Sequence, residues 1–142
     1  MYRFSLVIAI VAVVAVSAAL GSAQAAKYGS FKTPSGNIVC GYGSGSIGCG
    51  IATGLKPAPK NTCTDLDYSG KRMSVHTSGR AVLDLCAGDP GPFLFTKTAP
   101  VLAYGSSWRG DGITCASRRA GLTCTNRSGH GFFMSRAASY RF

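Results

Sequence analysis

The sequence predicts a small all-β domain, a sandwich or barrel of short antiparallel hairpins stapled by disulfides. Three observations support this prediction. After residue 25 the chain is rich in Gly, Ser and Thr, contains no Glu and is a poor helix former. Short apolar stretches alternate with turn residues, and six cysteines follow Val39. We expect at most one short helix, near the C-terminus, over residues 135–140.

The first 25 residues are predicted to be a signal peptide, outside the domain. Arg3 gives a positive start, residues 6–20 are almost continuously apolar, and Ala23-Gln24-Ala25 has the small-x-small pattern of a cleavage site. The alternative, an uncleaved anchor, would need about 20 apolar residues. We therefore expect one mature domain over residues 26–142, secreted or periplasmic, with no integral membrane span after cleavage.

The cysteines are predicted to form three disulfides, because their number is even and the chain is expected to be exported. A metal site would need Cys-x-x-Cys spacing or histidine partners, and the sequence has neither, so we expect no metal and no cofactor. The cysteines are Cys40, Cys49, Cys63, Cys86, Cys115 and Cys124.

The spacing of the first two cysteines predicts a β-hairpin over residues 38–51. Apolar residues alternate on both sides of Gly43-Ser44-Gly45-Ser46, which has turn composition. Folding the chain about this turn places Cys40 opposite Cys49, where the Cβ atoms of paired strands lie about 4.5–5.5 Å apart. This is close enough for a disulfide after slight tightening.

The same layout occurs 75 residues later, where Cys115 and Cys124 flank a tip at residues 118–121. It predicts a second disulfide-linked hairpin and leaves Cys63 to pair with Cys86. The similarity is either an internal duplication or two hairpins that follow the same rules.

The remaining elements are predicted from short apolar runs. Strands are expected over residues 71–75 and 80–85, on either side of a turn at 77–79. Three more short strands are expected, over residues 93–95, 101–104 and 131–134. The turn Asp89-Pro90-Gly91-Pro92 precedes the first of these.

The charge of the chain favours anionic partners. Without Arg3, fourteen Lys and Arg residues remain against five Asp residues, a net charge of +9. Such a charge favours nucleic acid and the phosphates or acidic groups of envelope lipids and glycans. Because the basic residues are scattered, the charge is more typical of a feature that keeps a protein soluble than of a binding site.

One candidate chemistry is hydrolysis by two histidines, one acting as base and the other as acid. His76 and His130 are the only histidines, and a basic nuclease would suit them. Against this, His76 lies in an expected strand where a solvent-facing histidine is ordinary. Paired carboxylates are a weaker basis for catalysis, because the few aspartates include only one close pair, Asp65 and Asp67.

Two stretches are candidates for binding an anion. Arg118 and Arg119 lie at the expected tip of the second hairpin, and His130 lies between two glycines after Asn126 and Arg127. Glycine lets a backbone bend closely around a bound group, which is typical of anion sites. The alternative for His130 is a structural turn. Asn126-Arg127-Ser128 also forms a glycosylation sequon.

Several motifs carry a resemblance to a known family. They are Thr33-Pro34-Ser35-Gly36-Asn37-Ile38 with Cys40, Cys86-Ala87-Gly88-Asp89, Leu102-Ala103-Tyr104-Gly105, Gly129-His130-Gly131-Phe132 and Ser135-Arg136. With these motifs the chain resembles a family of small exported bacterial proteins known only as a domain of unknown function. The resemblance implies export and disulfides but no reaction.

We therefore expect an exported, non-catalytic binding or envelope-associated protein that contacts anionic ligands weakly. The alternative is a small secreted basic hydrolase that uses His76 and His130. An inhibitor of lysozyme would fit the size, but two basic proteins would repel each other during encounter.

Overall fold

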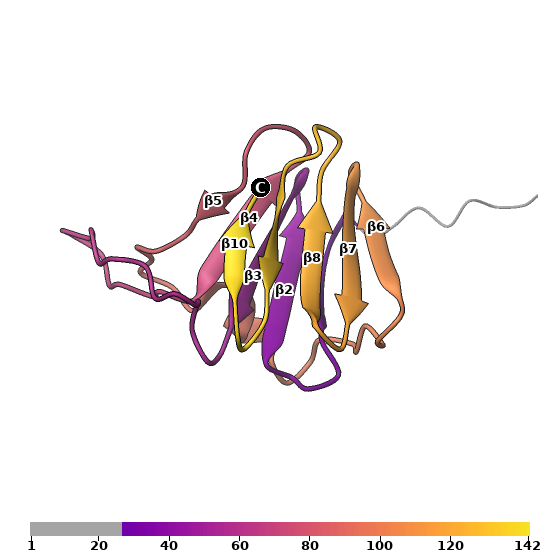
Figure 1. Ribbon diagram of the computed structural model, residues 1–142, viewed down its shortest axis with the longest axis horizontal. Helices are drawn as coiled ribbons and strands as arrows, with labels where there is room; N and C mark the ends of the chain where they lie inside the picture. The colour runs from indigo at the N-terminus through magenta and orange to yellow at the C-terminus, as the bar shows by residue number, and fades with distance from the viewer. Residues whose placement is uncertain (1–26) are drawn as a thin grey trace, which may run out of the picture.

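Two five-stranded antiparallel sheets lie face to face in the computed structural model, which describes residues 27–142 (Figure 1). The first sheet contains β1 (Tyr28–Lys32), β2 (Ile38–Gly43), β3 (Ser46–Ile51), β4 (Arg72–His76) and β5 (Val82–Leu83). The second contains β6 (Ser107–Gly110), β7 (Ile113–Arg118), β8 (Gly121–Thr125), β9 (Gly131–Met134) and β10 (Ser139–Arg141). Strands that follow each other in sequence are neighbours, so each sheet is a meander.

The predicted all-β sandwich is confirmed, and the sheets do not close into a barrel. The signal peptide expected over residues 1–25 lies outside the described residues. Within the part of the chain that the structure describes, no helix is long and apolar enough to cross a membrane.

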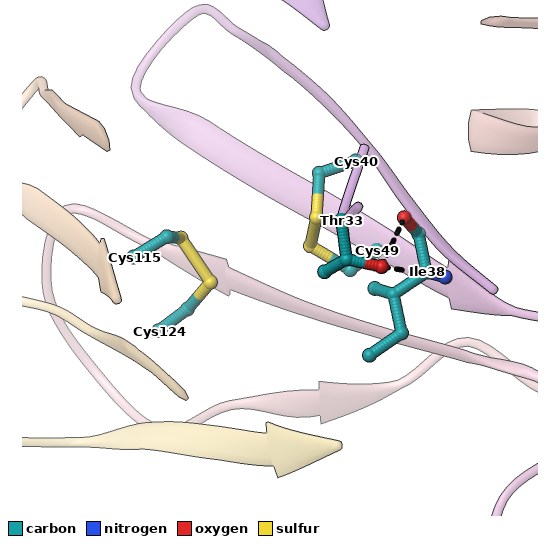
Figure 2. Close-up of a disulfide and its surroundings, with 6 residues drawn as sticks. All are labelled: Thr33, Ile38, Cys40, Cys49, Cys115 and Cys124. Carbon is teal, nitrogen blue, oxygen red and sulfur yellow. Dashed lines mark hydrogen bonds between the residues drawn. A yellow bond between two sulfur atoms is a disulfide. The ribbon is translucent and has the colours of Figure 1, made fainter. Parts of the chain in front are cut away.

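The predicted disulfide pairs are all present. Cys40 lies opposite Cys49 and Cys115 opposite Cys124 in the strand registers, with Cα–Cα distances of 4.1 and 4.0 Å. Both of these disulfides lie inside the sandwich (Figure 2), and their cysteines are completely buried. The third joins Cys63 to Cys86. Three disulfides indicate that the protein folds in an oxidising environment.

The similarity between the two hairpins extends to their neighbouring strands. In the first sheet Phe31, Cys40, Cys49 and Met73 form one row across four strands. In the second sheet Trp108, Cys115, Cys124 and Phe132 form the corresponding row. The rings of Phe31 and Trp108 are 6.0 Å apart between centroids. The two rows therefore meet across the core, and each half of the chain repeats the same meander around its disulfide.

The core contains the inward-facing, alternate residues of the central strands, as in other β-sandwiches. Ile47, Val75, Leu122 and Met134 are all completely buried. Most outward positions of β2 and β3 are glycines, among them Gly41 and Gly50. Aromatic rings from outside the sheet lie against them, with Phe95 on Gly41 and Phe93 on Gly50.

The prediction of a strand over residues 93–95 is wrong, because this segment is the 3₁₀ helix η1 (Gly91–Phe95). Pro90 and Pro92 have no N–H to donate to a strand ladder. The backbone instead makes local bonds, from Phe93 N–H to the Pro90 oxygen and from Thr96 N–H to the Phe93 oxygen. This hydrogen-bond pattern winds the segment into a helix.

The sequence allowed at most one short helix, over residues 135–140, and this segment forms a turn and a strand instead. The Ser135 hydroxyl accepts hydrogen bonds from the N–H groups of Ala137 and Ala138, which closes a turn. The chain then enters β10, where Tyr140 stacks on Phe133 of β9 at 5.2 Å between ring centroids. This cross-strand aromatic contact favours the strand.

The strand expected over residues 101–104 is reduced to a single bridge between Val101 and Lys32. Val101 is more than half exposed, and the segment crosses from the first sheet to the second. The strands expected over residues 71–75 and 131–134 are confirmed as β4 and β9, with a shift of at most one residue, and the strand expected over residues 80–85 is reduced to the two residues of β5.

Candidate functional site

Three turns and one loop meet at one end of the sandwich and enclose a pocket. The turns join β1 to β2, β7 to β8 and β9 to β10, and the loop carries Tyr104. Successive strands of a meander run in opposite directions, so alternate turns of a sheet lie at the same end. These three turns therefore lie at one end of the sandwich. The pocket has a volume of about 450 Å³. Its polar lining consists of Thr33, Ser35, Asn37, Tyr104, Arg118, Arg119, Ser135 and Arg136.

The turn between β1 and β2 is held by the side chain of Thr33, which is almost completely buried. Its hydroxyl accepts a hydrogen bond from the Ile38 N–H at 3.3 Å, beside the Cys40–Cys49 disulfide (Figure 2). Gly36 has a φ of 71°, a conformation that glycine adopts without steric cost, and its N–H donates to the Thr33 oxygen. This turn is therefore a preorganised wall of the pocket.

Ser35 presents a hydroxyl on the same turn. Its oxygen accepts a hydrogen bond from the Asn37 N–H at 3.3 Å, and the Thr33 hydroxyl lies at the same distance. A hydroxyl carries one proton and two acceptor sites. The Ser35 proton is therefore available either to Thr33 or to a bound group, since Ser35 is exposed.

The three arginines reach the pocket from two different turns. Arg118 is anchored by a hydrogen bond from Nη1 to the Ser117 oxygen at 2.8 Å. The Arg119 guanidinium lies over the Tyr104 ring, 5.2 Å from its centroid, which is a cation–π contact. Arg136 is exposed on the β9–β10 turn. The pocket therefore combines two oriented guanidinium groups with one exposed guanidinium group.

No carboxylate neutralises these arginines within residues 27–142. The one ion pair there joins Arg72 to Asp89 at 3.2 Å, outside the pocket. None of the described residues that line the pocket is Asp, His or Cys. The pocket is therefore positively charged and rich in hydrogen-bond donors, a combination that suits an anionic group with several acceptor oxygens.

The other predicted site residues lie at the opposite end of β8. Asn126 is buried, and its amide nitrogen donates to the backbone oxygens of His76 and Gly79, at 2.9 and 2.7 Å. Its amide oxygen accepts from the N–H groups of Ser128 and His130. Because these four bonds use the whole amide, Asn126 has a structural role, and the sequon nitrogen is not accessible in the folded domain.

His130 and Arg127 are placed by the same turn. The His130 ring is hydrogen-bonded through Nδ1 to the backbone oxygen of Phe142 at 3.2 Å. Arg127 is exposed, and its side chain lies against Gly112. The predicted anion-binding residues therefore form two separate groups, with Arg118 and Arg119 at one end of the sandwich and Arg127 and His130 at the other.

The two histidines of the alternative hydrolase prediction lie near the same turn. Asn126 connects their backbones, since it bonds the His76 oxygen and the His130 N–H. His76 is exposed at the end of β4. The structure describes no hydrogen bond between the two rings. Within residues 27–142 no cluster of three potential metal ligands occurs either.

The sequence argument missed part of the pocket. Arg136, Tyr104, Ser35 and Asn37 were not predicted as site residues, although all four lie in the motifs that carry the family resemblance. Their convergence depends on the meander, which brings turns from both halves of the chain together. The available signal was limited to the turn residues Pro34 and Gly36 beside Ser35 and Asn37, because Tyr104 fell in an expected strand and Arg136 in the stretch where a helix was allowed.

Comparison with protein families gave a match over residues 7–142 to a model described as "Family of unknown function (DUF6636)". Neither the curated proteins nor the solved structures contain a match to the chain.

Proposed function

The chain belongs to the DUF6636 family of unknown function, and from the geometry of its own pocket we propose that it is an exported, non-catalytic binding protein. Its ligand is the phosphate or carboxylate group of an anionic glycan. The group occupies the pocket between the β1–β2, β7–β8 and β9–β10 turns.

The observation that carries the proposal is the set of three arginines around a pocket of about 450 Å³ with no acidic residue in its described lining. A guanidinium group forms paired hydrogen bonds with a phosphate or a carboxylate, and it keeps its charge under all ordinary conditions. The net charge of +9 that remains without Arg3 attracts such a group from solution. Two of the arginines are already oriented by contacts within the protein, which lowers the entropy lost on binding.

The polar side chains beside the arginines support a sugar as the carrier of the anion. Ser35, Asn37 and Tyr104 are uncharged groups that can exchange hydrogen bonds with sugar hydroxyls. The expected export signal supports this proposal, and the three disulfides fit an oxidising environment, as found outside the cell, where such glycans occur. The lining residues that the structure describes include none of the His, Asp or Cys residues that usually transfer protons or attack substrates. This composition favours binding over hydrolysis.

The test is a titration with two short anionic probes, an oligogalacturonate and a phosphorylated dextran oligomer, with unmodified dextran as the neutral control. Arg118→Gln/Arg119→Gln should weaken binding of both anionic probes about tenfold or more, the effect of losing about 1.4 kcal/mol. The matched control is Lys56→Gln/Lys60→Gln, which removes the same charge outside the pocket and should change the affinity less than about threefold.

Equal losses in the two variants would mean that diffuse charge binds the probes, and the proposed pocket would be wrong. A short single-stranded DNA serves as a third probe. Tighter binding of DNA than of either anionic glycan would overturn the choice of a glycan as the ligand.

A further inference from the structure

A second group of basic residues lies at the end of the sandwich opposite the pocket. We propose that its cavity between Arg80 and Arg141, the far-end cluster, is a second anion-binding site, and that the domain bridges two anionic glycan chains. The bridging role rests on the proposed function of the pocket. Beyond that function, the bridging role requires a second binding site on the domain and a second glycan chain.

The far-end cluster is assembled from both halves of the chain. Arg80 follows the turn after β4, and Arg141 ends β10. Together with Ala81 and Phe142 they line a cavity of about 280 Å³. Arg141 is fixed by a hydrogen bond from Nη1 to the Ala81 oxygen at 3.1 Å, so one guanidinium of the cavity is held in place by the opposite sheet.

Two further contacts bring the Arg127 turn to the same end. The Gly79 N–H donates to the Ser128 hydroxyl at 3.3 Å, and the Arg127 N–H donates to the Thr77 oxygen at 3.3 Å. The His130 ring is hydrogen-bonded to the Phe142 backbone oxygen. The acidic residue at this end is Asp111, which accepts a hydrogen bond from the Gly45 N–H. No ion pair between Asp111 and these arginines occurs among residues 27–142.

The two sites face away from each other along the strands. In Figure 1, β8 runs upward from its turn with β7, at the pocket end, towards the end where the C-terminus lies. Its five residues span roughly 17 Å at about 3.3 Å per residue. One flat surface, such as a lipid bilayer, cannot contact both ends at the same time. Two separate polymer chains can each contact one end. The position of the two sites at opposite ends therefore favours glycan chains as the ligands.

The first test counts sites by calorimetry, with a short oligogalacturonate as the probe. The wild-type protein should bind two oligomers per chain. Arg80→Gln/Arg141→Gln and Arg118→Gln/Arg119→Gln should each bind one, and Lys56→Gln/Lys60→Gln should still bind two. If Arg80→Gln/Arg141→Gln does not fold, Arg80→Gln alone replaces it, since Arg141 keeps its bond to Ala81.

The second test measures bridging directly. Biotinylated polygalacturonate on a surface captures the protein, and fluorescent polygalacturonate is then added. The wild-type protein should retain the fluorescent polymer, and Arg80→Gln/Arg141→Gln should retain at least about tenfold less while it still binds to the surface.

The outcomes separate the two proposals. Binding of one oligomer by the wild-type protein, or capture unchanged in Arg80→Gln/Arg141→Gln, overturns the far-end site and leaves the pocket intact. No binding by Arg80→Gln/Arg141→Gln overturns the pocket. A third outcome is that the wild-type protein sediments as a dimer and both variants capture the fluorescent polymer as well as the wild type does. Capture would then depend on self-association, and bridging by a single domain would be wrong.

Discussion

The side-chain amide of Asn126 donates a hydrogen bond to the backbone oxygen of His76 at 2.9 Å, across the two sheets. Asn126 belongs to the turn after β8, and His76 ends β4. The bond therefore fastens the far end of one sheet to the far end of the other. The β7–β8 and β1–β2 turns that contribute to the pocket lie at the opposite end.

Asn126→Asp should destabilise the domain strongly. The substitution keeps the shape but replaces a donor by an anionic acceptor that faces the oxygens of His76 and Gly79. Two buried carbonyl groups lose their partner, and we expect a loss of about 2–5 kcal/mol in the free energy of unfolding. Urea denaturation measures it. The control is Asn61→Asp, on an exposed loop, which should cost less than about 0.5 kcal/mol. Similar stabilities of the two variants would contradict the assigned role.

The glycines on the outer face of β3 give a matched pair of predictions. A methyl group at Gly50 would lie 2.6 Å from the Phe93 ring, whereas one at Gly48 would lie 3.9 Å from the nearest atom, Ser74 Cβ. Gly50→Ala must therefore displace η1 and should cost about 1–3 kcal/mol. Gly48→Ala should be neutral or stabilise the strand by a few tenths of a kcal/mol. Thermal unfolding of both variants checks this, and a greater loss in Gly48→Ala would show that η1 does not pack as described.

The disulfides should be reduced in a fixed order. Cys86 is exposed and Cys63 is half-buried, whereas both hairpin disulfides are completely buried. Low concentrations of dithiothreitol should therefore open Cys63–Cys86 first, at a cost of about 3 kcal/mol in the chain-entropy model. Graded reduction, alkylation and peptide mass spectrometry give the order. Earlier labelling of Cys40 or Cys115 would contradict the buried position of the hairpin disulfides.

His130→Ala should lower the thermal midpoint by a few degrees and leave the affinity of the pocket unchanged. The lost hydrogen bond to Phe142 is worth about 1 kcal/mol, and His130 lies at the other end of β8 from Arg118. His76→Ala, at an exposed position, is the control and should leave the midpoint unchanged. If His130→Ala weakened the binding of oligogalacturonate to the Arg118–Arg119 pocket, the two ends of the sandwich would be coupled.

The sequence predicted the parts of the fold that depend on local alternation. The register of Cys40 with Cys49 and of Cys115 with Cys124 follows from the period of two in a strand and the length of the turn, both readable along the chain. β1 and β6 were missed because their residues are mostly small or polar, and they are strands only because a neighbouring strand pairs with them. Tyr140 was left in a stretch compatible with a helix, because its stacking partner, Phe133, lies on a different strand.

The candidate site was predicted in part for the same reason. Arg118 and Arg119 are adjacent in sequence and could be identified from it. Arg136 and Ser35 join them only after the meander closes, and the distance in sequence between these segments gives no sign of contact. The separation of Arg127 and His130 from Arg118 also becomes visible only in three dimensions, because residues a few positions apart lie at opposite ends of one strand.

The most direct test of the pocket is a nuclear magnetic resonance titration that follows the Nε–Hε signals of the arginines and the backbone amides as oligogalacturonate is added. We predict saturable shifts of the Arg118, Arg119 and Arg136 signals, together with the amides of residues 33–37. The Lys56 and Lys60 amides should not shift. Small shifts spread evenly over basic residues, without saturation, would contradict an anion-binding pocket.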